Sequence, residues 1–282
     1  MSNLLQRHAV SIDRRLVLLA PVGAKVPRVF RGAIADGDER SEILKAVQRL
    51  RGSVYLAEGA VQPHQLERDG RHVTREDDRA WHMVTRDGHG DVTACSWYLE
   101  HPGAKSIFDV RARHCPLNKT GEWRHRLRAA IAAEMQAARH SGIPFAEVGG
   151  WAVAPEHRGS GDGLIHVFVM FSLSIALGGA IGLTTATVRH SSAAMLRRMG
   201  MAPVEANGYT VPTYYDASYQ CDMELLRFDT RRPSPQYVGV VDTLRSRLGD
   251  VSVYGSYRPD VVDMPALHPA LVQSRAFQPL VA

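Results

Sequence analysis

A glycine-rich turn near the middle of the chain has the residue types best suited to bind an anion. It reads Arg-Gly-Ser-Gly-Asp-Gly over residues 158–163 and follows an apolar stretch that ends at Pro155. Glycines let backbone N–H groups approach an anion closely, and the start of the helix expected next adds partial positive charge. Arg158 can add charge-assisted hydrogen bonds. The turn therefore predicts a pyrophosphate or phosphopantetheine site, with a glycine-rich helix start that binds nothing as the alternative.

The elements that must position this turn alternate along the chain. Strand-like segments occupy residues 27–34, 80–86, 92–99, 145–153, 181–188, 208–213 and 221–228. Helix-like segments occupy residues 39–58, 123–140, 164–177, 191–199 and 237–248. This order predicts an α/β protein in which a twisted mixed β-sheet has helices on both faces. We expect one domain over residues 27–255, an N-terminal extension over 1–26 and a C-terminal arm or tail over 256–282.

Composition narrows the class of protein. The chain has 282 residues, 45% of them hydrophobic, and a formal net charge of +5, which permits an acidic partner without requiring one. Its three cysteines form no CxxC pair, so neither a disulfide framework nor a metal site is expected. The N-terminus lacks a signal-peptide pattern, and the apolar segment 164–183 is interrupted by Gly178-Gly179. We therefore expect a cytoplasmic protein that does not bind a membrane.

The glycine-rich turn resembles the donor loop of the GNAT acetyltransferase superfamily, which reads Arg/Gln-x-x-Gly-x-Gly/Ala. Arg158, Gly161 and Gly163 match this pattern, and the similarity covers roughly residues 27–228. The resemblance implies a GNAT-like sheet whose donor strand opens against its neighbour and meets the pantetheine arm of a thioester. It implies acyl-CoA or phosphopantetheine-linked acyl carrier protein as co-substrate, with no permanently bound cofactor. The donor contacts would be Ala152, Val153, Arg158, Gly159, Ser160, Gly161, Asp162 and Gly163.

Within this superfamily the layout is similar to that of the acyl-homoserine-lactone synthases and long-chain N-acyl amino acid synthases. Arg51 and Tyr55 match a helical Arg-x-x-x-aromatic pair of those enzymes, and Glu147 matches their strand glutamate. The sequence departs from the lactone synthases at Trp97 and Gly150, where they have arginines. The acceptor is therefore expected to differ. The superfamily's common tyrosine acid is replaced by Leu196, so the leaving thiolate needs another proton donor.

Glu147 is the first candidate for the catalytic base. It lies on a mostly apolar strand, where a carboxylate is costly unless it is hydrogen-bonded or used. We expect it to accept the amine proton, directly or through water. A structural carboxylate that satisfies a loop or binds the substrate ammonium is the alternative. His82 and His190 are the other candidate bases, although a lone histidine is more often structural.

Candidate substrate-binding residues flank this strand. They are Arg51, Tyr55, Asp77, Trp97 and Trp151. Asp77 could hold an ammonium group or only be solvated, and the tryptophans could line a pocket or pack in the core. Residues 111–128 carry six Lys or Arg and one acid, Glu122. That segment could dock an acidic carrier protein or a tRNA, or it could be a solvated helix face.

The leading hypothesis is an N-acyltransferase. It would move an acyl group from acyl carrier protein or acyl-CoA to a primary amine of a small molecule or amino acid. A second hypothesis takes the acyl group from an aminoacyl-tRNA, since some GNAT-fold proteins do this. A third is a catalytically inactive GNAT-like module that binds RNA or a partner protein, because one tyrosine and two arginines of the resembled enzymes are absent.

Overall fold

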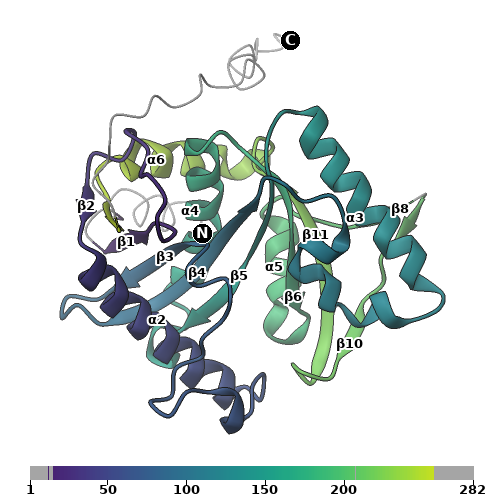
Figure 1. Ribbon diagram of the computed structural model, residues 1–282, viewed down its shortest axis with the longest axis horizontal. Helices are drawn as coiled ribbons and strands as arrows, with labels where there is room; N and C mark the ends of the chain where they lie inside the picture. The colour runs from purple at the N-terminus through teal and green to yellow at the C-terminus, as the bar shows by residue number, and fades with distance from the viewer. Residues whose placement is uncertain (1–11, 13–14, 207, 257–282) are drawn as a thin grey trace.

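The computed structural model describes residues 12, 15–206 and 208–256 (Figure 1). Its strands are β1 (Leu16–Leu19), β2 (Ala33–Ala35), β3 (Trp81–Arg86), β4 (Val92–His101), β5 (Phe145–Val153), β6 (Ile181–Thr187), β7 (Ala202–Pro203), β8 (Glu205–Ala206), β9 (Tyr209–Thr210), β10 (Tyr214–Asp216), β11 (Cys221–Asp229) and β12 (Ser252–Gly255). Its α-helices are α2 (Gly37–Ala57), α3 (Trp123–His140), α4 (Asp162–Ala176), α5 (Ser192–Arg198) and α6 (Val238–Leu248).

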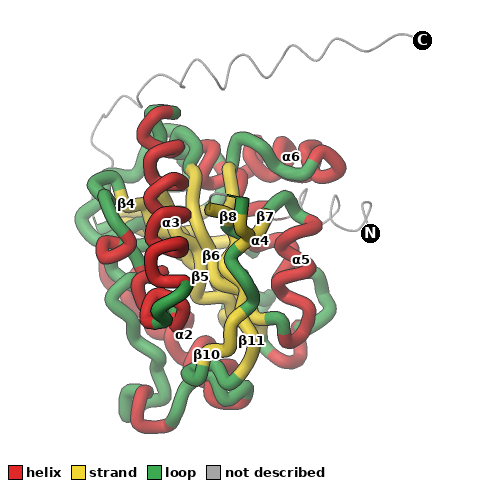
Figure 2. The backbone as a smooth tube through the Cα atoms, turned by 90° about the vertical axis from the view of Figure 1, so that its right-hand side faces the viewer, coloured by secondary structure: helices red, strands yellow, loops and turns green. Residues whose placement is uncertain are grey.

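Within the described residues, one large sheet has the order β10-β11-β6-β5-β4-β3-β1-β12-β2, and β7 pairs with β11. The pairs β5–β6, β1–β12 and β12–β2 are parallel, and the other pairs are antiparallel. Helices α2 and α3 cover one face, whereas α4, α5 and α6 cover the other (Figure 2). The predicted α/β class, with a mixed sheet and helices on both faces, is confirmed.

Strand β1 lies among the residues expected to form an N-terminal extension. It pairs with β3 from Leu16↔Thr85 to Leu19↔His82 and also with β12, so the sheet begins before the predicted boundary at residue 27. All four residues of β1 are buried, and such an apolar run lacks the alternation that marks a half-exposed strand. Residues 27–32 of the predicted strand 27–34 form turns and irregular structure, and only its end belongs to β2. Of the predicted C-terminal arm, only residue 256 is described.

Helix α2 begins directly after a capping residue, Asp36. The Asp36 side chain accepts a hydrogen bond from Glu39 N at 2.9 Å and satisfies one of the helix's free amides. Ile43, Leu44 and Val47 then recur on the buried face, which packs on the sheet. Helix α3 follows the predicted bounds, with Leu127 and Ile131 in its buried face.

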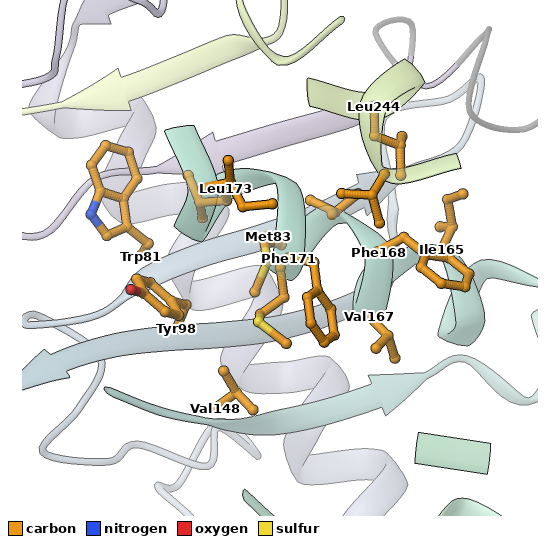
Figure 3. Close-up of a cluster of buried hydrophobic side chains, with 14 of the residues drawn as sticks. Trp81, Met83, Tyr98, Val148, Ile165, Val167, Phe168, Phe171, Leu173 and Leu244 are labelled. Atoms are coloured by element: carbon orange, nitrogen blue, oxygen red, sulfur yellow. The ribbon is translucent and has the colours of Figure 1, made fainter. Parts of the chain in front are cut away.

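Helix α4 is apolar almost all round because it is covered on both sides. Phe168, Phe171 and Leu173 contact the sheet or α6, and Figure 3 shows them beside Met83, Tyr98 and Val148 of the strands. The segment 164–183 is therefore a buried helix, a glycine turn and a buried strand, as predicted. Among the described residues, no helix has the length and apolar character needed to cross a bilayer.

Strands β5 and β6 are paired only at their beginnings. Their parallel register runs from Phe145↔Ile181 to Val148↔Thr184, after which the two ribbons diverge (Figure 1). Gly150 has a φ of 66°, and the register between β5 and β4 shifts over Cys95–Trp97. This irregularity bends β5 away from β6. Beyond Val148 the backbone of β5 has no strand partner on its β6 side in the described chain.

Candidate active site

A cavity of about 1390 Å³ occupies the opening between β5 and β6. Its walls come from the end of α2, from β4, from the turns over 111–119, from the glycine turn, from α5 and from β10–β11. Most of the predicted site residues line it, namely Tyr55, Trp97, Glu147, Trp151, Ala152, Val153, Arg158, Gly159, Gly161 and Gly163. The topology thus brings the glycine turn and the strand glutamate to one continuous cavity.

The glycine turn has the backbone conformation that its residue types predict. Gly159 and Gly161 have φ values of 86° and 93°, a region that other residues enter at a cost of about 1 kcal/mol. Gly161 caps α4, and the Ser160 hydroxyl accepts a hydrogen bond from Asp162 N at 3.2 Å. A side chain at Gly159 or Gly161 would meet nothing within 4 Å. The turn therefore needs glycine for its dihedral angles, and the space beside it is open.

Asp162 turns its side chain away from the cavity. The carboxylate is fully buried, and its Oδ1 accepts a hydrogen bond from Arg15 Nη2 at 2.9 Å. His157 Nδ1 lies 3.9 Å from Oδ2, which has no hydrogen-bond partner. Asp162 thus ties the start of α4 to the residue before β1. Its backbone is still part of the turn, but its side chain and Ser160 do not line the cavity.

Arg158 reaches across the cavity opening. Its Nη2 lies 2.6 Å from Oε1 of Glu58, the C-cap residue directly after α2. Arg189, which follows β6, donates one hydrogen bond to the backbone oxygen of Glu58 and another to that of Gln220. The partners are 100 and 131 residues apart from Glu58, so no local pattern in the sequence indicates either contact.

Glu147 is buried at the inner end of the cavity, and both of its oxygens are engaged. Oε2 accepts a hydrogen bond from Arg111 N at 2.8 Å, and Oε1 accepts one from Ala112 N at 3.0 Å. His101 Nε2 lies 2.9 Å from Oε2, at an ion-pair distance but without hydrogen-bond alignment. These contacts match the alternative interpretation of Glu147, a carboxylate that satisfies a loop. Its role as a base stays a prediction.

The anchoring contacts lead to a stability prediction. Glu147→Gln is expected to lower the free energy of unfolding by about 1–3 kcal/mol, because an amide NH₂ would then face one of the two backbone N–H donors. Urea denaturation followed by circular dichroism measures this change. Glu122→Gln is a matched control, since the Glu122 side chain is 73% exposed and its ion pair with Arg126 is long, at 3.5 Å. Equal stability of the two variants would contradict the anchor.

Trp97 lies directly against the bend of β5. A Cβ atom on Gly149 would lie 2.7 Å from Trp97 Cζ2, and one on Gly150 would lie 2.2 Å from Cδ1. The Arg111 guanidinium lies over the indole, with Cζ 5.5 Å from the ring centroid. The indole therefore requires glycine at both positions. Trp97 and Gly150, which both depart from the lactone-synthase pattern, form one packed unit in the cavity wall.

Arg51, Asp77 and His82 form a cluster inside the protein and do not line the cavity. Arg51 Nη2 lies 2.7 Å from Asp77 Oδ1, and both side chains are at most 3% exposed. Gln48 and Thr74 also donate hydrogen bonds to Asp77. Burial opposes the charge on Asp77, but Arg51 and the backbone of Thr74 hold the pKa of that carboxyl below its ordinary value.

His82 completes this cluster through the backbone of Asp77. Its Nε2 lies 2.8 Å from the Asp77 backbone oxygen, and its ring is fully buried. Burial, together with the charge of Arg51, lowers the pKa of His82 to about 4. The structure therefore places this predicted base, and the predicted ligands Arg51 and Asp77, in a supporting position. His190 lies in the short turn Arg189–Ser191, and its side chain lies outside the described part of the chain.

No family model and no curated protein matches this sequence. Among solved structures, a CoA-dependent acyl-homoserine lactone synthase, BjaI, solved with MTA, is similar with a TM-score of 0.50. The match covers 93% of this chain and 98% of that one, at 14% identity. The protein has the GNAT fold. FeeM, an N-acyl amino acid synthase from uncultured soil microbes, matches 70% of the chain and 88% of its own at 14% identity, with a TM-score of 0.42.

Arylalkylamine N-acetyltransferase 2 from Aedes aegypti matches 67% of the chain and 95% of its own at 14% identity, with a TM-score of 0.43.

Leu196 of the present chain is buried and lines the cavity, and its aliphatic side chain has no proton to donate. Other hydroxyls also line the cavity, among them those of Tyr55, Tyr214 and Tyr219. Burial raises the pKa of all three, so they stay protonated at neutral pH.

Proposed function

We propose that this protein is an N-acyltransferase. It moves an acyl group from a thioester donor, acyl-CoA or acyl carrier protein, to a primary amine of a small molecule or amino acid. One observation carries the proposal: a single cavity runs from the glycine turn, along the unpaired part of β5, to Glu147. That arrangement suits a donor with a phosphate at one end and a reactive carbonyl at the other.

Each part of the cavity has a distinct role in this reaction. The turn around Gly161 would hold the donor phosphate by its backbone N–H groups. The β5 backbone around Ala152 and Val153 would bind the amides of the pantetheine arm. The amine nitrogen would then attack the thioester carbonyl, the C–S bond would break, and the sulfur would leave as a thiol. The amine must lose a proton and the sulfur must gain one, so the net proton count is unchanged.

The acceptor would enter from the side of α2 and α3. There the cavity is lined by Tyr55, Trp97, Arg111, His114 and Lys119. Arg111 is already paired with Glu76 at 2.6 Å, and it covers the Trp97 ring. This wall differs from that expected for a lactone synthase, because Trp97 and Gly150 stand where two arginines would be. An acceptor other than that of the lactone synthases is therefore proposed.

The proposal is tested by offering three donors in parallel to the purified protein. Acyl-CoA, acyl carrier protein thioester and aminoacyl-tRNA would each be incubated with a panel of amines, and products followed by mass spectrometry. We expect an acylated amine with a thioester donor. Product formed only from aminoacyl-tRNA, and lost after RNase treatment, would contradict the proposal in favour of the tRNA-dependent transferase. Ligand binding without turnover of any donor would favour an inactive binding module.

The same assay separates the two interpretations of Glu147. If Glu147 is only an anchor, Glu147→Gln keeps measurable turnover at temperatures where it is folded, and its pH–rate profile follows that of the native protein. If Glu147 is the base, turnover falls by about 10²-fold or more even in the folded variant. Undiminished turnover of Glu147→Gln would exclude Glu147 as the catalytic base.

A further inference from the structure

Arg158, the arginine expected to bind the donor phosphate, forms an ion pair with Glu58. The Arg158 guanidinium lies 2.6 Å from the Glu58 carboxylate, and both side chains line the cavity. They are 46% and 33% exposed, respectively, so the pair faces solvent and can exchange partners. Solvent-exposed ion pairs of this kind are weak, and a phosphate with two negative charges can attract Arg158 more strongly than one carboxylate does.

Glu58 contacts an arginine from each side of the opening between β5 and β6. The residue sits at the C-terminal end of α2, between the turn after β5 and the turn after β6. Its carboxylate holds Arg158 on the β5 side, and its backbone oxygen accepts from Arg189 on the β6 side at 3.1 Å. Glu58 therefore bridges the two diverging strands. Only the Arg158 contact uses the side chain, so a substitution can break it without removing the Arg189 contact.

We propose that Glu58 is a displaceable counter-ion of Arg158, which a phosphate-bearing donor must replace when it binds. This inference rests on the proposed function and adds a specificity-determining residue to it. In the free protein, Glu58 holds Arg158 in place and lowers the affinity for phosphate. A donor portion without phosphate gains nothing from Arg158, so its binding does not depend on Glu58. Removal of the Glu58 charge is thus expected to favour phosphate-bearing donors selectively.

Binding of free coenzyme A and of pantetheine, measured by isothermal titration calorimetry, tests this proposal without requiring turnover. Glu58→Gln keeps the length of the side chain and removes its charge. We expect it to bind coenzyme A about three- to ten-fold more tightly than the native protein, with no change for pantetheine. Glu156→Gln is the matched control, because Glu156 is an exposed acid of the same turn. It should change the coenzyme A affinity by less than two-fold.

A double variant shows whether the effect passes through Arg158. Arg158→Gln should weaken coenzyme A binding, and adding Glu58→Gln to it should then cause no further change. Equal coenzyme A affinity of the native protein and Glu58→Gln would overturn the role of Glu58 while leaving the donor site intact. An equal gain for pantetheine, or for Glu156→Gln, would overturn it as well. If coenzyme A binds to none of these proteins, this inference is overturned, whereas the proposed function is decided separately by the assay with three donors.

Discussion

Arg51→Ala is expected to destabilise the protein by about 3–5 kcal/mol, although Arg51 does not itself line the cavity. The Arg51 side chain is 1% exposed and lies 2.7 Å from Asp77, which is 3% exposed. Removing one member of such a pair leaves the other charge buried without compensation. Asp77 would keep its hydrogen bonds from Gln48 and Thr74 but lose its counter-ion.

Arg51→Ala should also weaken contacts outside the Arg51–Asp77 ion pair. Arg51 also donates a hydrogen bond to the backbone oxygen of His72 at 2.9 Å, and Asp77 is the residue whose backbone oxygen contacts His82. The cluster thus fastens the loop after α2 to the start of β3. His72 and Thr74, which belong to that loop, line the cavity. We therefore expect a lower melting temperature together with weaker acceptor binding.

Denaturation in urea at pH 7 measures the effect. Arg49→Ala is the control, because Arg49 belongs to the same helix, is 52% exposed and lies 3.5 Å from Asp69. It should cost about 0.5 kcal/mol or less. If Arg51→Ala instead keeps native stability but loses acceptor affinity, Arg51 acts on the substrate directly, as the family resemblance implies.

The second large effect is a loss of stability in acid. Burial lowers the pKa of both His82 and His166 to about 4, with the charge of Arg51 adding to the effect at His82. The His166 ring lies between two hydroxyls, with Nε2 2.8 Å from Thr85 Oγ1 and Nδ1 2.9 Å from Ser96 Oγ. Both rings are therefore neutral in the folded protein at pH 7.

The direction follows from the proton count. In the unfolded chain these histidines titrate near pH 6.5, so between pH 6.5 and 4 the unfolded state binds more protons than the folded state. The free energy of unfolding therefore falls as the pH falls through this window, by about 3 kcal/mol for each histidine. Above pH 6.5 both states are neutral at these sites, and their contribution no longer changes with pH.

Urea denaturation at a series of pH values from 7 to 4 measures this slope. His166→Gln should make the slope shallower, because one of the two neutral rings is gone, although the variant is less stable at pH 7. His89→Gln, at an exposed position of the β3–β4 turn, should leave the slope unchanged. A slope in His166→Gln equal to that of the native protein would show that His166 is not responsible.

Local patterns predict much of the fold and the glycine turn. The bounds of α3, the Asp36 cap and the β3–β4 hairpin depend on residues that are neighbours in sequence, so periodicity and turn chemistry indicate them. The residue type likewise indicates the positive φ of Gly159 and Gly161, because glycine enters that region without steric cost. The conformation of the glycine turn was predictable for this reason, and its role in donor binding stays a prediction.

The tertiary structure alone decides which charges meet. Asp77 lies 26 residues from Arg51, Glu147 lies 35 and 36 residues from its two backbone donors, and Arg158 lies 100 residues from Glu58. The order of the strands sets these pairings, and so does the bulge that parts β5 from β6. Local propensity carries no information about them, because a side chain's partner depends on packing between distant elements. The sequence by itself therefore determined the conformation of the glycine turn, because that depends on residue type, and the folded chain determined which partner each buried carboxylate has.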